Sequence, residues 1–222
     1  MVRLEKVRKS YTEKGRTVEA LRPTTLTLEP GAFVAVVGPS GSGKTTLLSI
    51  LGGMLAPESG RVWLENQSLY DLPLRQRTQI RRQRIGFVFQ SFNLIPYLTA
   101  LENVQTPLYL AGVAPAEQQR RAETLLRRLG LGDRLRHRPA QLSVGQQQRV
   151  SLARTLANDP ALILADEPTG NLDPDTREHV LHLLESFRRE GRTVVMVTHD
   201  PAAAARADRV LRLADGDIRE AA

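Results

Sequence analysis

The chain contains the segment Gly38-Pro39-Ser40-Gly41-Ser42-Gly43-Lys44-Thr45, which has the spacing G-x-x-x-x-G-K-[ST] of a phosphate-binding loop. Its glycines allow the backbone to curl so that successive N–H groups point inward around an anion. The alternative is an ordinary glycine-rich turn, but this segment follows a predicted strand and precedes a predicted helix, as phosphate binding requires. The predicted nucleotide-binding residues here are Gly38, Ser40, Gly41, Ser42, Gly43, Lys44, Thr45 and Thr46.

Two side chains of this loop have further predicted roles. We expect Lys44 to reach the β- and γ-phosphates of a nucleoside triphosphate and the Thr45 hydroxyl to ligate magnesium. The chain uses arginine almost everywhere else, and its only lysines are Lys6, Lys9, Lys14 and Lys44. A lysine in the loop of so arginine-rich a chain indicates that position 44 needs a compact ammonium group rather than a planar guanidinium.

Strands alternate with helices on both sides of the loop. The apolar run at 33–37 predicts a buried strand, and residues 45–50 open a helix after the loop. Further predicted elements are buried strands at 85–89, 161–165 and 193–197 and a helix from about 174 to 190. This order predicts an α/β fold with a parallel sheet covered on both faces.

Two other regions complete the predicted architecture. Leu26 and Leu28, like Val62 and Leu64, alternate with polar residues, which predicts an antiparallel edge. Residues from about 91 to 160 are rich in Arg, Gln and Leu and predict a helical subdomain inserted between two core strands. We therefore expect a single domain over 1–222, with its α/β core at 1–90 and 161–222.

Two carboxylates follow the predicted strand at 161–165. In the segment Ala161-Leu162-Ile163-Leu164-Ala165-Asp166-Glu167-Pro168, both acids stand at the carboxyl end of the strand, where α/β sheets bind ligands. Asp166 suits a magnesium site, and Glu167 suits polarising an attacking water. An acidic pair in this position is often only a helix N-cap. The phosphate-binding loop in the same chain favours the catalytic interpretation.

A third segment, Gln141-Leu142-Ser143-Val144-Gly145-Gln146-Gln147-Gln148-Arg149, begins a helix with apolar residues at helical spacing. Ser143 and Gly145 stand where that helix starts, so its N–H groups and partial positive charge can face an anion. On physical grounds alone, the segment is an ordinary capped amphipathic helix. Only the particular string of residues favours a binding role.

Composition excludes several classes of protein. No stretch approaches the roughly 20 apolar residues of a membrane span. The absence of cysteine excludes disulfides and thiolate catalysis, and the four histidines do not cluster at metal-ligand spacing. The net charge of +7 is compatible with an anionic partner. Because most of the arginines fall on predicted helices, a solvated helical face is the simpler interpretation. The same holds for the arginine-rich segment 75–84, for which an approach to lipid headgroups is the alternative.

Taken together, these motifs resemble the ABC ATPase family over essentially the whole chain. Residues 38–45 correspond to its Walker A motif, 162–167 to Walker B and 142–146 to its signature motif. The resemblance implies a P-loop NTPase (RecA-like) core with an antiparallel β edge subdomain. It also implies an inserted helical subdomain that carries the signature, with ATP and Mg²⁺ as cofactors.

The resemblance extends to four shorter motifs. It implies that Gln90 contacts nucleotide and magnesium, that His199 contacts the γ-phosphate, and that Tyr11 stacks under adenine. The alternatives are a polar strand end for Gln90, a turn cap for His199 and an ordinary core or surface tyrosine. Asn171-Leu172-Asp173 matches the D-loop, in which Asp173 links two sites. The implied catalytic residues are Glu167, His199 and Lys44, and the implied metal ligands are Thr45, Gln90 and Asp166.

The signature departs from the family pattern at one position. The family usually has glycine where this chain has Val144, and a β-branched side chain resists both a positive φ and close backbone approach. Ser143, Gly145 and Gln146, which the resemblance places on a nucleotide, are retained. We expect an active site with somewhat altered dimerisation.

The resemblance also implies partners. Two copies are expected to form a homodimer on ATP binding and to drive a separate integral membrane permease, so the chain is expected in the cytoplasm, peripheral on the inner face of the membrane. Residues 86–104 are similar to the branch that serves macrolide exporters and lipoprotein-releasing complexes. Family members that act on chromosomes have a long coiled-coil insertion, and those that act on ribosomes usually carry two cassettes in one chain. Neither feature is present, so no nucleic-acid partner is expected. Regulation of a membrane complex without cargo transport, as in cell division or signalling, stays open.

Overall fold

The phosphate-binding loop follows the third strand of a six-stranded sheet. This computed structural model describes residues 2–13, 16–170 and 172–221. The strands lie in the order β10-β9-β3-β8-β7-β6, and all neighbours are parallel except β9 and β10. Their bounds are β3 (Phe33–Val37), β6 (Ile85–Phe89), β7 (Leu162–Asp166), β8 (Thr193–Val197), β9 (Arg209–Ala214) and β10 (Asp217–Glu220).

Both faces of this sheet are buried, which explains its unbroken apolar strands. Alternate residues of β3 enter different cores: Val34 and Val36 pack on one face, and Phe33 and Ala35 on the other. Strands β7 and β8 alternate in the same way. Because side chains alternate across a strand, a run with no polar residue is the pattern that two covered faces require.

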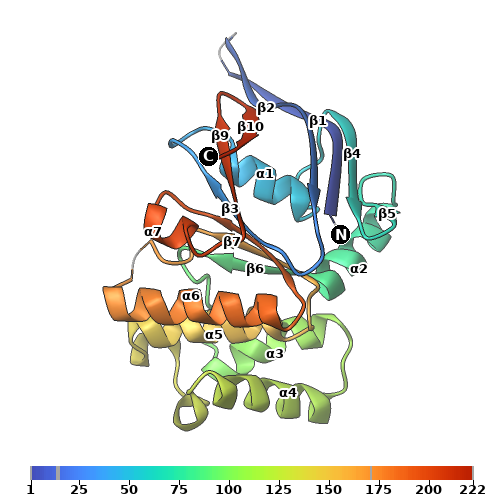
Figure 1. Cartoon of the computed structure of the whole chain (residues 1–222). Coiled ribbons are helices and arrows are strands. Elements are labelled where there is room, and N and C mark those ends of the chain that lie inside the picture. Colours follow the sequence, from blue (N-terminus) through green and yellow to red (C-terminus); the bar gives the residue numbers. More distant parts are fainter. Residues whose placement is uncertain (1, 14–15, 171, 222) are drawn as a thin grey trace.

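A second sheet covers one face and is antiparallel. Its order is β2-β1-β4-β5, with bounds β1 (Val2–Glu13), β2 (Arg16–Leu28), β4 (Ser59–Leu64) and β5 (Gln67–Ser68). The predicted antiparallel edge is confirmed, although β1 lies between the two segments identified from sequence: Val2 pairs with both Leu28 and Leu64. Helix α1 (Lys44–Leu51) is buried between the two sheets through its leucines and Ile50 (Figure 1).

Helices cover the opposite face. Between β6 and β7 the chain forms α3 (Ala100–Leu110), α4 (Pro115–Arg128) and α5 (Val144–Leu156), with short 3₁₀ turns at Gly132–Arg134 and Pro139–Gln141. These helices share one apolar core with α6 (Pro174–Arg189) and with the sheet (Figure 1). The remaining helices are α2 (Leu74–Arg84) and α7 (Pro201–Ala204). The predicted α/β class, with an antiparallel edge and inserted helices, is confirmed.

In the part of the chain that the structure describes, no helix has both the length and the apolar character needed to cross a bilayer.

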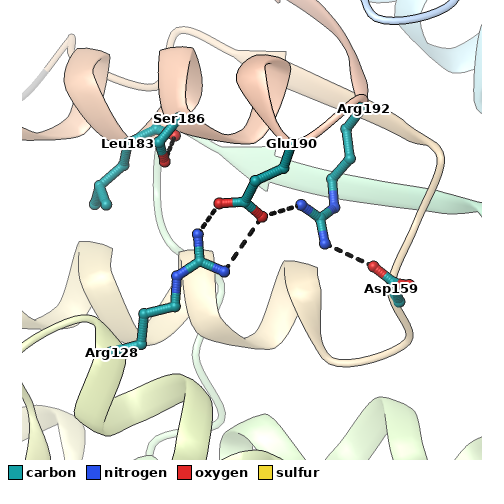
Figure 2. Close-up of polar contacts among 6 residues, drawn as sticks. All are labelled: Arg128, Asp159, Leu183, Ser186, Glu190 and Arg192. Atoms are coloured by element: carbon teal, nitrogen blue, oxygen red, sulfur yellow. Dashed lines mark hydrogen bonds and ion pairs between the residues drawn. The ribbon is translucent and has the colours of Figure 1, made fainter.

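An ion network joins the end of α4 to the core (Figure 2). The Glu190 carboxylate, which follows α6, accepts hydrogen bonds from Arg128 at the end of α4 and from Arg192 before β8. Arg192 also donates to Asp159, at 2.6 Å. Burial acts to raise the pKa of Glu190, but the two arginines outweigh it and hold the pKa below the ordinary 4.5. The network therefore favours the charged form of Glu190 in the folded protein.

The Glu190→Gln variant is expected to lose about 0.5–1 kcal/mol of the free energy of unfolding at pH 7, a typical value for partly exposed ion pairs. A depressed carboxylate pKa gives stability that is present above the unfolded pKa and is lost as the pH falls through the folded one. The gap between parent and variant should therefore shrink below about pH 4.5. Urea unfolding across pH, with Asp133→Asn as a control for loss of an exposed acid, measures this. A gap that persists in acid would contradict it.

Candidate functional site

The predicted phosphate-binding residues meet the predicted carboxylates at one cavity of about 380 Å³. The loop contributes one wall, and the ends of β6 and β7 contribute another. The lining residues are Tyr11, Val18, Ala20, Ser40, Gly41, Gly43, Lys44, Thr45, Thr46, Gln90, Asp166, Glu167 and Val197. Gly38 and Ser42 belong to the same loop but are not among these lining residues.

The loop owes its path to close backbone packing. Gly43 has φ +102°, and a Cβ there would lie 2.1 Å from the carbonyl oxygen of Ala20. Only glycine fits that conformation and that approach. Gly43 is also the N-cap of α1 and offers no side-chain cap to the first N–H groups of the helix. These donors and the positive helix end are left for an anion at the cavity wall.

Lys44 lies folded back over the loop. Its Nζ donates to the carbonyl oxygen of Gly38 at 2.9 Å and to that of Pro39 at 2.8 Å. A tetrahedral ammonium has three donors, so two carbonyls leave one N–H for a ligand in the cavity. This geometry supports the predicted need for lysine at this position.

Thr45 and Asp166 stand side by side. The Thr45 hydroxyl donates to Asp166 Oδ2 at 3.4 Å, although the two residues are far apart in sequence. Burial raises the pKa of Asp166, and the charge of Glu167 adds to this, while Thr45 and Lys44 oppose it. A hydroxyl and a half-buried carboxylate are hard oxygen donors that suit Mg²⁺. The Gln90 side chain reaches the same cavity and lies against Gly170.

Glu167 stands at the edge of this cavity. Its backbone has φ +46°, an uncommon conformation for a non-glycine residue, and its N–H donates to Val197 O at 3.0 Å. Its carboxylate oxygen Oε1 lies 2.9 Å from His199 Nδ1. The Glu167 side chain is only 16% exposed, whereas that of His199 is 71% exposed. The pair therefore combines a sheltered carboxylate with an accessible imidazole.

The β1–β2 hairpin forms the outer wall of the cavity. Tyr11 pairs with Val18 across the two strands, and the Tyr11 hydroxyl lies 3.4 Å from Thr46 Oγ1. Both side chains are partly exposed, so an aromatic ring and an aliphatic side chain face the opening. Sequence reasoning missed Val18 and Ala20, because a strand register between distant positions has no local sequence signal.

The signature residues lie elsewhere. Ser143, Gly145 and Gln146 are not among the residues that line the cavity described above. Ser143 caps α5 through a capping box with Gln146, at 3.0 and 3.2 Å. Gly145 packs closely on α6, since a Cβ there would lie 2.9 Å from Thr176 Cγ2. A buried hydrogen bond from Gln148 to Pro168 O, at 2.9 Å, fixes α5 against the turn after Glu167.

The valine of the signature adopts an ordinary helical conformation. Val144 is the first residue of α5 and is not among the residues with positive φ, so its β-branched side chain costs no left-handed strain. The side chain is exposed at the start of the helix.

In the predicted D-loop, Asn171 lies outside the described residues, and Asp173 caps α6 by accepting from Thr176 N at 3.0 Å. That hydrogen bond lowers the pKa of Asp173.

A family model, curated relatives and solved structures that match this chain all belong to one family. The ABC transporter family model matches residues 21–170. An uncharacterized ABC transporter ATP-binding protein of Thermotoga maritima is 52% identical over 201 residues, which are 90% of this chain and 86% of that protein. The macrolide export ATP-binding/permease protein MacB of Marinobacter nauticus is 48% identical over 220 residues. Those residues are 99% of this chain but 34% of that protein, so the chain spans about a third of this relative.

A solved structure is similar over the full length. It is a dimeric, post-hydrolysis state of the ATP-binding cassette MJ0796 bound to ADP and Pi. The TM-score is 0.91 at 45% sequence identity, and the match covers 100% of this chain and 98% of that one.

Proposed function

The chain belongs to the ABC transporter family of ATP-binding proteins, and we propose that it hydrolyses ATP to drive a membrane permease. One observation carries the proposal: Lys44, Asp166 and Glu167 line a single cavity, while the signature residues Ser143 and Gly145 do not. A site so divided is complete only when a second copy supplies the signature. The dimeric cassette of similar structure supports this arrangement.

In the proposed site, the loop binds the phosphates. Lys44 and the uncapped N–H groups of α1 neutralise the β- and γ-phosphates. Tyr11 and Val18 offer the apolar surface on which adenine rests. Thr45, Asp166 and Gln90 would hold Mg²⁺, which when bound neutralises charge on the phosphate oxygens.

Glu167 is the proposed base. Its carboxylate is sheltered at the edge of the cavity, where it orients the attacking water for in-line displacement of the leaving ADP. His199, in contact with Glu167 at 2.9 Å, fixes the carboxylate and donates toward the γ-phosphate. The proton of the water passes to Glu167, and the products are ADP and phosphate.

Dimer closure follows from a difference in contacts. The γ-phosphate contacts the loop of one copy in the open state, and it gains Ser143 and the start of α5 from the other copy in the closed state. A ligand shifts an equilibrium only by such differential binding. Hydrolysis removes the bridge, so the dimer reopens.

The permease would dock in a second cavity of about 330 Å³ between β6, α3 and α5. Its apolar lining includes Phe87, Phe89 and Leu110, with Arg82 and Arg154 also present. We propose that an amphipathic segment of the permease with an acidic residue fits it. Phe89 lines this groove and the next residue, Gln90, lines the nucleotide cavity, so a movement of the chain at the groove is passed to the nucleotide cavity.

Macrolide export is the activity named for the MacB relatives. The proposed setting of this chain is a related exporter or force-transmitting complex, with the chain peripheral on the inner membrane face.

The test combines two measurements. With a non-cleavable ATP analogue, sedimentation should show a dimer, and affinity purification from membranes followed by mass spectrometry should recover one integral membrane protein. A chain that stays monomeric at every concentration, even with that membrane protein present, would refute the dimer mechanism. Recovery of a membrane-bound hydrolase complex in place of a permease would favour the regulatory alternative.

Restoring glycine at the signature, by Val144→Gly, is expected to change ATP turnover by less than about tenfold. The reason is that Val144 sits at the first helical position without backbone strain, so glycine relieves none. Turnover and analogue-induced dimerisation should be measured together, because the exposed side chain can change turnover only through the contact between the two copies. An increase in turnover of roughly a hundredfold or more would show that Val144 disables the site.

A further inference from the structure

Helix α2 carries a positive charge of which the proposed function uses only Arg82. Its sequence LRQRTQIRRQR contains five arginines and no acidic residue, and none of its residues is fully buried. The arginines are Arg75, Arg77, Arg81, Arg82 and Arg84.

The inner contacts of α2 hold it in place without neutralising it. Arg77 lies over the Tyr70 ring at 5.1 Å, and Arg81 donates to Gly53 O at 3.3 Å. Neither partner is an anion. Within the described residues, Arg84 is the only arginine of this helix in an ion pair, with Glu65. Arg75 and Arg82 are exposed two turns apart, on the same side of the helix.

Exposed apolar side chains surround the same helix. Leu74, its first residue, is 66% exposed. Met54 follows Gly53, the acceptor for Arg81, and is exposed. Leu110, whose carbonyl accepts from Arg82 at 3.2 Å, and Tyr109 end α3 and are exposed as well. By contrast, the exposed Tyr11 and Val18 are accounted for by the nucleotide cavity.

We propose that this surface, defined by α2 with Met54 and Tyr109, rests on an anionic lipid bilayer. Arginines clustered on one helix, beside exposed aromatic and aliphatic side chains, form the pattern of a protein surface at the headgroup boundary. Helix α2 lies against β6 (Figure 1), and Arg82 lines the groove proposed for the permease. On that proposal, α2 is on the side of the chain that faces the membrane-embedded partner. The lipid proposal rests on the proposed function only for the orientation of α2 toward the membrane.

An acidic protein segment is the competing occupant. It would need to match arginines spread along a whole helix, with apolar side chains on both flanks. A lipid surface meets both requirements at once, since headgroups supply charge over an area and the boundary below accepts Leu74 and Tyr109. The attraction between the α2 arginines and anionic headgroups is strong only when they lie within about a Debye length of each other, roughly 8–10 Å.

The experiment is flotation of the purified chain with phosphatidylcholine vesicles, with and without phosphatidylglycerol. Binding is expected only to the anionic vesicles, and it should be lost in 1 M salt, where the Debye length is about 3 Å. Arg75→Glu should weaken binding by about thirtyfold, since it removes one favourable charge and adds an unfavourable one. Leu74→Ser should weaken it severalfold.

The matched control is Arg136→Glu, which makes the same charge change at an exposed site in the loop bonded to the start of α3, whereas α2 contacts the end of α3. Equal weakening by the two variants would reduce the effect to net charge and overturn the proposal, as would failure of the parent to bind anionic vesicles. If the chain bound the purified permease through α2 but did not bind anionic vesicles, the occupant would be an acidic protein segment, and the lipid proposal would be overturned. ATP turnover in solution, measured on Arg75→Glu, should be unchanged, so failure here is distinguishable from failure of the proposed ATPase function.

Discussion

Glu167→Gln is expected to lower ATP turnover by about 10³-fold while ATP binding persists, which is within the usual contribution of a general base. The amide keeps the size of the carboxylate but cannot accept the water proton. The γ-phosphate bridge between two copies then survives, so the closed dimer should accumulate. Single-turnover hydrolysis and analytical sedimentation with ATP measure the two effects.

The control for this variant is Glu178→Gln, which neutralises an exposed acid of α6. It should leave turnover near that of the parent. If Glu167→Gln retained near-normal turnover, Glu167 would have no central role, and the contact with His199 would be only structural.

Lys44→Arg is expected to weaken ATP binding about as much as Lys44→Ala, by roughly 10²–10³-fold, a typical cost of removing one partner of a sheltered charge pair. The Lys44 ammonium bridges the carbonyls of Gly38 and Pro39 and has one donor left for phosphate. A planar guanidinium is larger and directs its donors in a fixed fork, so it cannot meet all three acceptors. Equilibrium binding of a fluorescent ATP analogue provides the measurement.

Lys6→Arg, at an exposed position of β1, is the matched substitution and should not affect binding. Should Lys44→Arg bind ATP as the parent does, charge alone would account for position 44, and the argument from ammonium geometry would fail. The two large effects are separable, because the Lys44 variants lose binding whereas Glu167→Gln loses only turnover.

Local pattern was enough to predict the central elements of the fold. The runs at 33–37, 85–89 and 193–197 coincide with β3, β6 and β8, because strands buried on both faces must be apolar throughout. The predicted strand at 161–165 is β7, displaced by one residue. The terminal strands β9 and β10 were not predicted. Strand β10 is the edge of the sheet and β9 lies next to it, and both have charged residues between the apolar ones, so strand and loop patterns overlap there.

In the site, too, part of the arrangement follows from local sequence and part only from tertiary structure. Sequence alone determined which residues carry charge and phosphate-binding chemistry, because glycines, Lys44 and the acids after β7 act through local backbone geometry and their own functional groups. Tertiary structure decided what they meet: that Asp166 reaches Thr45, that Glu167 reaches His199, and that Val18 and Ala20 complete the cavity. It also decided that Ser143 and Gly145 lie outside that cavity. Such contacts join distant segments, and they depend on strand order and register, which the packing of two cores fixes and no short stretch of sequence encodes.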